Sequence, residues 1–326
     1  MPHPLLRHIA QQVPPQYFVL AAFGLLLVVL KLVYPQPYRH NPMSVQYALY
    51  MMGIFVVASI LGQARKLAHS DDRREGISRA MAMVRDWLPF VLCLWVYENL
   101  HDLTMWIRPQ TLDHHLARAD LWLFGVQPTL WLERVMHPLL TDYMAVAYMT
   151  YFVLPFLLSG WLYFRGHVPA FKELQLALLV TFYGGFLGYI IVPAVGPQLI
   201  LADAYHKPLV GWYFFWTAKR VVTRLQYFPR DCFPSLHTAV SSVTLFFMLR
   251  HQRTVPLRHL VAPIWTILTV SLWISTVYLR YHWVVDVFAG WGLTVLSCAA
   301  GVLVQRHWPS APPERENAPA PEVAHV

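Results

Sequence analysis

Residues 280–305 read RYHWVVDVFAGWGLTVLSCAAGVLVQ, so Arg280, His282 and Asp286 stand at the start of a long apolar run. A membrane-spanning helix needs about 20 consecutive, mostly apolar residues, and residues 283–305 meet that requirement. The glycines of this run favour close contacts between helices in a membrane. Ionisable residues at membrane depth are energetically unfavourable and usually serve a function. The stretch therefore predicts a spanning helix with a functional site at its start.

The composition of the whole chain supports a membrane protein. Of its 326 residues, 57% are hydrophobic and only 13% are charged, whereas an average soluble domain is about one quarter charged. The net charge of +8 is not gathered on a soluble domain. We therefore interpret the basic residues as loops beside anionic lipid headgroups, and we expect no nucleic-acid partner.

Hydropathy extends this prediction along the chain. We expect an all-α integral membrane protein with about eight transmembrane helices. The predicted spans cover residues 17–34, 45–62, 87–105, 141–163, 173–193, 236–250, 260–279 and 283–305. Residues 106–135 are too polar to span, and their tryptophans and apolar pieces predict an interfacial helix.

These spans suggest a division into three regions. Residues 1–86 would form an N-terminal region with two spans and a basic cytoplasmic loop. Residues 87–308 would form the catalytic membrane domain. Residues 309–326 are rich in Pro, Ala and Glu, a composition that predicts a disordered tail.

The distribution of basic residues predicts the orientation in the membrane. Six Lys and Arg residues lie between residues 63 and 86, next to two predicted spans. Because basic residues concentrate on the cytoplasmic side of membrane proteins, we expect this loop and both termini in the cytoplasm. The loops after the fifth and seventh spans would then lie on the extracytoplasmic or lumenal face.

A second histidine is predicted to lie on that same face. Residues 230–239 read RDCFPSLHTA and place His237 at the start of the sixth span. His237 and His282 can therefore meet where both loops open. Asp286 follows His282 by four residues, which on a helix would put it on the same side, one turn deeper. Such a carboxylate would fix the imidazole tautomer and make the other ring nitrogen a better nucleophile.

Two histidines, a carboxylate and nearby cations suit phosphoryl transfer. One histidine would attack phosphorus while the other protonates the leaving oxygen. The start of the sixth span offers unpaired backbone N–H groups to an anion. Ser235, two residues before His237, can add a hydroxyl donor to phosphate.

At this point the residues resemble the type 2 phosphatidic acid phosphatase (PAP2) superfamily, whose pattern includes P-S-G-H and S-R-x5-H-x3-D. Here Pro234–His237 reads P-S-L-H, and Ser275 begins S-T-x5-H-x3-D. The resemblance implies that His282 is the phosphorylated nucleophile, Asp286 its orienting partner and His237 the general acid. It also implies a catalytic bundle made of the last five or six helices. We expect no cofactor and no metal.

The sequence departs from the superfamily pattern in three places. Leu236 replaces the glycine, Thr276 replaces the arginine, and no K-x6-R-P motif is present. The P-S-L-H piece, the prolines of Pro193–Pro197, the stretch DLWLFGVQP at 120–128 and the ending YHWVVDVFAG are instead similar to the branch that contains fungal inositol phosphorylceramide synthase. The resemblance covers roughly residues 95–305, and it implies transfer of a headgroup.

The missing motif leaves the phosphate-binding cations to be supplied from elsewhere. Arg280 stands two residues before His282, and Arg230 stands seven before His237, so both are candidates. Lys219 and Arg220 are weaker candidates, because they can equally bind lipid headgroups.

The sequence thus predicts phosphoryl or headgroup transfer on a lipid phosphoester through a phosphohistidine intermediate, with a phospholipid or sphingolipid as substrate. If water is the acceptor, the enzyme is a lipid phosphatase. Two other classes stay open: a proton-coupled transporter of an anionic solute, and a metal site formed by His237, His282 and Asp286. The sequence assigns no role to Cys232 and leaves the oligomeric state open.

Overall fold

The computed structural model describes residues 13–34, 72–98, 100–225 and 230–309. Within these ranges every regular element is a helix, and the only β-type pairing is an isolated parallel bridge between Ala194 and Asp231. The predicted all-α class is confirmed for this part of the chain. The predicted span at 45–62 lies outside the described residues, as does almost all of the predicted tail at 309–326.

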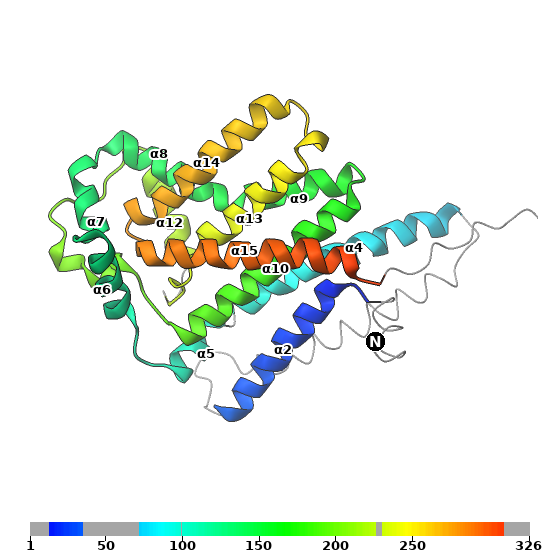
Figure 1. Cartoon of the computed structure of the whole chain (residues 1–326), viewed down its shortest axis with the longest axis horizontal. Helices are drawn as coiled ribbons and strands as arrows, with labels where there is room; N and C mark the ends of the chain where they lie inside the picture. The colour runs from blue at the N-terminus through cyan, green and yellow to red at the C-terminus, as the bar shows by residue number, and fades with distance from the viewer. Residues whose placement is uncertain (1–12, 35–71, 99, 226–229, 310–326) are drawn as a thin grey trace, which may run out of the picture.

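Helices of several lengths make up the described structure (Figure 1). The long helices are α2 (Pro15–Val33), α4 (Asp72–Glu98), α10 (Val168–Ile191), α14 (Arg258–Tyr278) and α15 (Val284–His307). Those of intermediate length are α5 (Leu100–Ile107), α6 (Asp113–Phe124), α8 (Pro138–Met149), α9 (Leu154–Phe164), α12 (Phe214–Leu225) and α13 (Leu236–Arg250). The short ones are α7 (Pro128–Trp131), α11 (Pro197–Ile200), and the 3₁₀ turns η2 (Leu132–Val135), η3 (Thr150–Phe152), η4 (Ala202–Ala204) and η5 (Gln252–Thr254).

Four helical segments in the described ranges are long and apolar enough to cross a membrane. They are α10, α14, α15 and the continuous run Pro138–Phe164, which joins α8, η3 and α9. The chain is therefore a multi-pass membrane protein. α2 and α13 are apolar but shorter. At about 1.5 Å per residue, the 15 residues of α13 reach less far than the roughly 30 Å of a hydrocarbon core. The prediction of eight spans is thus not confirmed.

α10 is the central helix of the bundle. It contacts α2, α4, α5, α9, α13 and α15, and Figure 1 shows it crossing α15. Leu174, Leu178 and Phe186 of α10 are buried among these neighbours. A helix that is apolar on most of its surface must be covered by other helices or by lipid, and these buried residues show that other helices cover much of α10. α10 therefore provides the platform on which α13 and α15 are placed.

α13 and α15 pack closely because α15 carries a glycine where they touch. A Cβ atom on Gly290 would lie 2.7 Å from the carbonyl oxygen of Ser235 and 3.1 Å from Cβ of Thr238. The neighbouring Gly292 is different, because a Cβ there would meet no atom within 4 Å. Gly290, and not Gly292, lets the beginning of α13 approach α15.

We therefore expect Gly290→Ala to lower the free energy of unfolding by about 1–3 kcal/mol, since the added methyl group must push α13 away. The matched control is Gly292→Ala in the same helix, which is expected to be neutral or slightly stabilising. Thermal unfolding of both variants in detergent measures the difference. Equal melting temperatures for the two variants would contradict this account of the α13–α15 contact.

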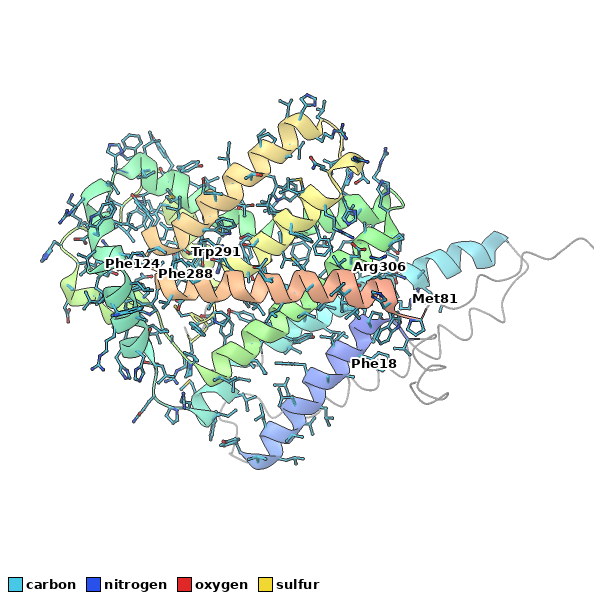
Figure 2. The ribbon with its side chains drawn as sticks, viewed as in Figure 1. Phe18, Met81, Phe124, Phe288, Trp291 and Arg306 are labelled. Atoms are coloured by element: carbon cyan, nitrogen blue, oxygen red, sulfur yellow. The ribbon has the colours of Figure 1, made fainter. Side chains whose placement is uncertain are left out.

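α6, α7 and α12 gather at the end of the bundle where α15 begins (Figure 1). The Phe124 ring of α6 lies 6.4 Å from the Phe288 ring of α15, and Figure 2 shows both beside Trp291. Residues 106–135 were predicted to form an interfacial helix, and they do contain α6 with a Trp122 side chain that is 83% exposed. Their position in the membrane stays a prediction.

Candidate active site

The two predicted histidines lie side by side. His237 is in the first turn of α13, and His282 precedes the first residue of α15. The centroids of their rings are 5.6 Å apart. A backbone hydrogen bond from Ser235 N–H to the Asp286 carbonyl, 3.0 Å long, joins the starts of the two helices. The structure therefore brings together the two segments that the sequence paired.

Asp286 orients the turn that carries His282. Its Oδ2 accepts a 2.8 Å hydrogen bond from the backbone N–H of Trp283 and lies 3.4 Å from Nδ1 of His282. The expectation that His282 and Asp286 share one helix, with the carboxylate one turn deeper, is wrong, because α15 begins only at Val284. The side chain of Asp286 instead reaches back toward the turn. Since Nδ1 faces the carboxylate, Nε2 of His282 points to the opposite side of the ring.

Cys232 is a third member of this cluster. Its thiol donates to Oδ2 of Asp286 at 2.9 Å, and Sγ lies 3.2 Å from the Tyr281 carbonyl and 3.5 Å from Nδ1 of His282. Burial, and then the Asp286 carboxylate, raise the pKa of this thiol well above its usual value. The thiol therefore keeps its proton and can donate it in a hydrogen bond. Sequence reasoning missed this role, and closeness to the P-S-L-H motif was the only signal.

His237 has aromatic neighbours and an unused nitrogen. Its ring stacks on Tyr148 at a centroid distance of 4.3 Å, and Tyr151 lies at 4.2 Å. The Nε2 atom is buried and has no hydrogen-bond partner in the described part of the chain. A buried polar atom without a partner is unfavourable unless a ligand completes it. His237 thus has a buried ring nitrogen whose hydrogen-bonding capacity no described protein group uses.

This histidine lines a cavity of about 590 Å³. Val91 and Phe156, which also line it, are 60% and 48% exposed, so the cavity opens on an apolar flank of the bundle. None of the described residues that form the wall is Lys or Arg. The wall residues are Phe90, Val91, Cys93, Tyr97, Tyr148, Tyr151, Phe152, Pro155, Phe156, Ser159, Leu178, Phe182, Phe186, Tyr189, Val222, Asp231, Leu236, His237 and Val240.

Leu236, the residue that replaces the superfamily glycine, fits because α10 supplies glycines. A Cβ atom on Gly185 would lie 2.5 Å from Cδ2 of Leu236. A Cβ on Gly188 would collide with the ring of Pro234. The P-S-L-H turn therefore rests on a glycine surface of α10, and its leucine contributes to the cavity wall.

Arg280 is engaged by protein groups. Its Nη2 donates to Glu133 at 2.9 Å and to the Lys207 carbonyl at 2.7 Å, and its guanidinium carbon lies 3.6 Å from the centroid of the Tyr205 ring. The backbone of Arg280 has a φ of 66°, which turns the chain at the end of α14. These contacts hold the turn in place. A role for Arg280 in binding phosphate stays a prediction.

The other two predicted phosphate ligands also have partners. Arg230 donates to the carbonyls of Arg108 and Pro109 at 2.9 and 2.7 Å. Ser235 is the N-cap of α13, and its Oγ accepts from the backbone N–H of Thr238 at 3.3 Å. The cap explains why α13 begins here. The cap uses the Ser235 oxygen as an acceptor and leaves its hydroxyl proton to be donated elsewhere. Its contact with phosphate stays a prediction.

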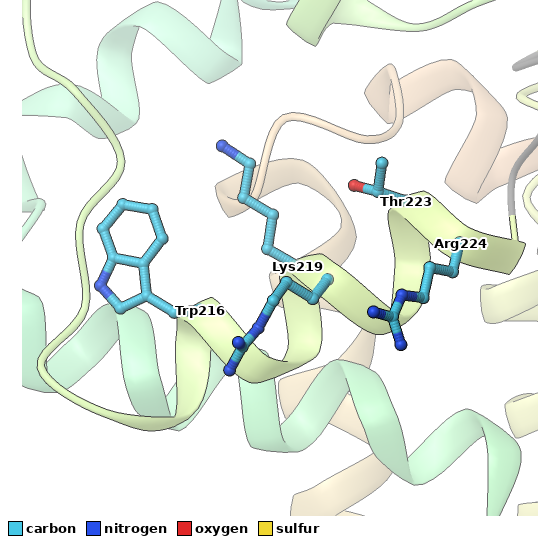
Figure 3. Close-up of a pocket in the computed structure, with 5 residues that line it drawn as sticks. Trp216, Lys219, Thr223 and Arg224 are labelled. Atoms are coloured by element: carbon cyan, nitrogen blue, oxygen red, sulfur yellow. The ribbon is translucent and has the colours of Figure 1, made fainter.

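α12 places basic residues close to the cavity. Val222 lines the cavity from the buried face of this helix. Trp216, Lys219, Arg220 and Arg224 line a separate groove of about 310 Å³, shown in Figure 3. α12 therefore lies between an apolar chamber and a cationic surface.

Acids in the segment from α6 to α8 hold the loops around the site, and buried Asp113 contacts two of the segments that form it. Its carboxylate accepts from the backbone N–H groups of Val195 and Gly196, at 3.0 and 2.9 Å. It also accepts from Nε1 of Trp283 at 3.0 Å. Asp113 thus joins α6 to the loop after α10 and to the residue that follows His282.

Asp120 holds the start of α15. Its two oxygens accept from the backbone N–H groups of Val284 and Val285, at 2.8 and 3.0 Å. Burial raises the pKa of Asp120 to about 6, although these two hydrogen bonds oppose the rise. The carboxylate is therefore ionised at neutral pH, and it stabilises the positive end of the helix.

Two more acids act in the same way. Glu133 accepts from the backbone N–H groups of His206 and Lys207. Asp142 accepts from the backbone N–H of Phe215 at 2.8 Å and so caps α12. The segment predicted only as interfacial therefore contributes to the scaffold of the site. The available signal was the set of carboxylates between predicted spans.

Comparison with known proteins agrees with this geometry. A family model described as PAP2 superfamily matches residues 114–300, which is more than half of the chain and includes both histidines and Asp286. No curated protein and no solved structure matches.

Proposed function

Because the chain belongs to the PAP2 superfamily, we propose that it transfers a phosphoryl-linked headgroup between lipids through a phosphohistidine intermediate on His282. Members of this superfamily act as phosphatases or phosphotransferases on lipid-like substrates. The observation that carries the proposal is the unpartnered Nε2 of His237, placed in a cavity beside a second, carboxylate-oriented histidine.

In the first half of the proposed reaction, Nε2 of His282 attacks phosphorus. The bond from phosphorus to the leaving oxygen breaks, and His237 gives that oxygen its proton. Asp286 supports the attack, because its Oδ2 lies 3.4 Å from Nδ1 of His282 and stabilises the charge that develops on the ring. The products are an alcohol, which leaves, and a phosphorylated His282.

In the second half, an acceptor hydroxyl attacks the same phosphorus. Its proton passes to His237, and the bond between phosphorus and His282 breaks. Both residues then regain their starting states, which a catalytic cycle requires. An alcohol as acceptor gives headgroup transfer, whereas water gives hydrolysis.

The negative charge of the phosphoryl group needs donors. Arg280 and Arg230 donate to protein acceptors. We therefore assign direct hydrogen bonding to the phosphoryl oxygens to the backbone N–H groups at the start of α13 and to the Ser235 hydroxyl. The basic surface of α12 supplies longer-range attraction for an anionic donor lipid. Arg280 and Arg230 remain candidates for direct contact.

The cavity supports an apolar substrate with at least one hydroxyl group. Its wall is aromatic and aliphatic, with tyrosines beside His237 and no Lys or Arg among the described wall residues. Such a wall favours the uncharged part of a phospholipid or sphingolipid. The exposed Val91 and Phe156 at its opening suit a molecule that enters from the bilayer. These features favour a lipid alcohol over water as the acceptor.

We further propose that the site opens on the extracytoplasmic or lumenal face. The basic residues between 63 and 86, several of which lie in the first half of α4 and not in a loop as predicted, support this orientation because of the cytoplasmic preference of Lys and Arg. Labelling of Lys219, on the proposed outer side, with a membrane-impermeant amine reagent in intact cells tests the assignment.

A panel of headgroup-labelled phospholipids, given to the full-length protein in mixed micelles with a membrane lipid extract, tests the proposed activity. We expect the label to appear in a new lipid. Label released only as phosphate would assign a phosphatase reaction instead, and label released only as a water-soluble phosphorylated headgroup would assign hydrolysis of the phosphodiester. If folded protein cleaves no lipid of the panel, both headgroup transfer and hydrolysis are contradicted.

A further inference from the structure

Three potential metal ligands converge next to His282. They are Sγ of Cys232, Nδ1 of His282 and Oδ2 of Asp286, and all three residues are buried. The distances are 2.9 Å from Sγ to Oδ2, 3.5 Å from Sγ to Nδ1 and 3.4 Å from Nδ1 to Oδ2. The three atoms come from three different positions in the chain and lie within 4.8 Å of one another.

These separations resemble those around one tetrahedral ion. Metal–ligand distances of about 2.3 Å for sulfur and 2.0–2.2 Å for nitrogen and oxygen put neighbouring ligands roughly 3.3–3.6 Å apart. The Sγ–Nδ1 and Nδ1–Oδ2 distances lie in that range, and the Sγ–Oδ2 distance of 2.9 Å must open by about 0.6–0.8 Å. A further donor is at hand, because Oδ1 of Asp286 is buried and has no partner among the described residues.

The backbone beside the cluster leaves room for such an opening. Gly196 has a φ of 89°, and a Cβ atom there would lie 3.3 Å from Sγ of Cys232 and 2.5 Å from the Tyr281 carbonyl oxygen. A larger residue at position 196 would therefore press on the thiol. Glycine allows the Cys232 side chain to shift without moving the backbone.

We propose that Cys232, His282 and Asp286 form an inhibitory binding site for one soft divalent cation of the Zn²⁺ or Cd²⁺ type. A thiolate and a carboxylate together balance the charge of a divalent ion, so the buried complex is neutral. Sulfur and imidazole ligands select Zn²⁺ and Cd²⁺ over Mg²⁺ and Ca²⁺, which prefer oxygen.

Inhibition follows from where the protons go. When the ion binds, the Cys232 thiol loses its proton to solvent and the ion takes the lone pair of Nδ1 of His282. The imidazole then carries its proton on Nε2. A protonated Nε2 has no lone pair with which to attack phosphorus. This consequence rests on the proposed nucleophilic role of His282, whereas binding of the ion does not.

Titration of the full-length protein with CdCl₂ tests the site, because a Cd²⁺–thiolate bond absorbs in the ultraviolet. We expect one Cd²⁺ per chain, a matching rise in absorbance and a parallel loss of lipid turnover. Cys232→Ser should remove the absorbance and raise the Cd²⁺ concentration for half-inhibition at least tenfold. Cys298→Ser, at a buried cysteine outside the cluster, should behave like wild type.

The ultraviolet absorbance tests whether Cd²⁺ binds at Cys232 even if no lipid substrate is found. Absorbance that survives in Cys232→Ser, or protein that retains no Cd²⁺ after gel filtration, would overturn the proposal. Stoichiometric binding at Cys232 with undiminished turnover would overturn the inhibitory role and, with it, the assignment of His282 as nucleophile. A protein with no lipid turnover but normal Cd²⁺ binding would overturn the proposed function alone.

Discussion

Replacing His282 with alanine is expected to reduce turnover of the labelled lipid donor by about a thousandfold or more, equivalent to roughly 4 kcal/mol in the activation barrier. The physical reason is that the substitution removes the atom proposed to bond to phosphorus. His282 lies before α15 and not inside it, so the loss of the ring should leave the helix in place. Folding should therefore change little.

Initial rates in mixed micelles, together with the melting temperature of each variant, measure this effect. His259→Ala is the matched control, because His259 lies at the start of α14 and is exposed. We expect it to keep wild-type turnover. Full turnover in His282→Ala would show that another group forms the bond to phosphorus.

The second large effect is expected at Asp113, through structure and not through contact with the substrate. Asp113→Ala leaves three buried or partly buried N–H groups without their acceptor: those of Val195, Gly196 and the Trp283 indole. An unsatisfied buried donor is unfavourable by about 1–3 kcal/mol. We therefore expect the free energy of unfolding to fall by about 3 kcal/mol or more, and the turn that carries His282 to lose its fixed position.

Denaturation in detergent and turnover at low temperature together measure the Asp113 effect. Asp113→Asn keeps one acceptor oxygen and should lie between alanine and wild type. Asp203→Ala, at an exposed acid of η4, should be near wild type in both assays. If Asp113→Ala unfolds like wild type, the acids of α6 do not hold the site as described.

Local patterns predicted much of the fold. The apolar runs at 141–163, 173–193, 260–279 and 283–305 coincide with the four segments long enough to span, because burial in lipid demands a continuous apolar surface. Where helices are short or interrupted, a continuous apolar run predicts them less well. Residues 87–105, predicted as one span, fall on α4 and the separate α5.

The candidate site was predictable where its residues stand next to a helix start. The P-S-L-H and R-Y-H-W-V-V-D stretches both have that position, so pairing them needed only the order of the helices. Asp113 and Trp283 are 170 residues apart, and no periodicity in the sequence reports such a contact. The same holds for Cys232, whose partner Asp286 is 54 residues away.

Arg280 shows what charge and sequence position alone do not reveal. A cation two residues before the proposed nucleophile is well placed in sequence to bind phosphate. Its backbone turns at a positive φ, however, and directs the guanidinium to Glu133 and Tyr205. The sequence does not encode that turn in any glycine or asparagine. The contacts of Arg280 with Glu133 and Tyr205 could therefore not be predicted from the sequence.

Trapping of the covalent intermediate tests the central claim most directly. The full-length protein is mixed with a ³²P-labelled phospholipid extract and quenched in alkali, in which phosphohistidine survives, and the labelled peptide is sequenced by mass spectrometry. The account predicts a phosphoryl adduct on His282, absent from His282→Ala and formed more slowly in His237→Ala. An adduct on any other residue, or turnover of the label without an adduct on His282 at any quench time, would contradict it.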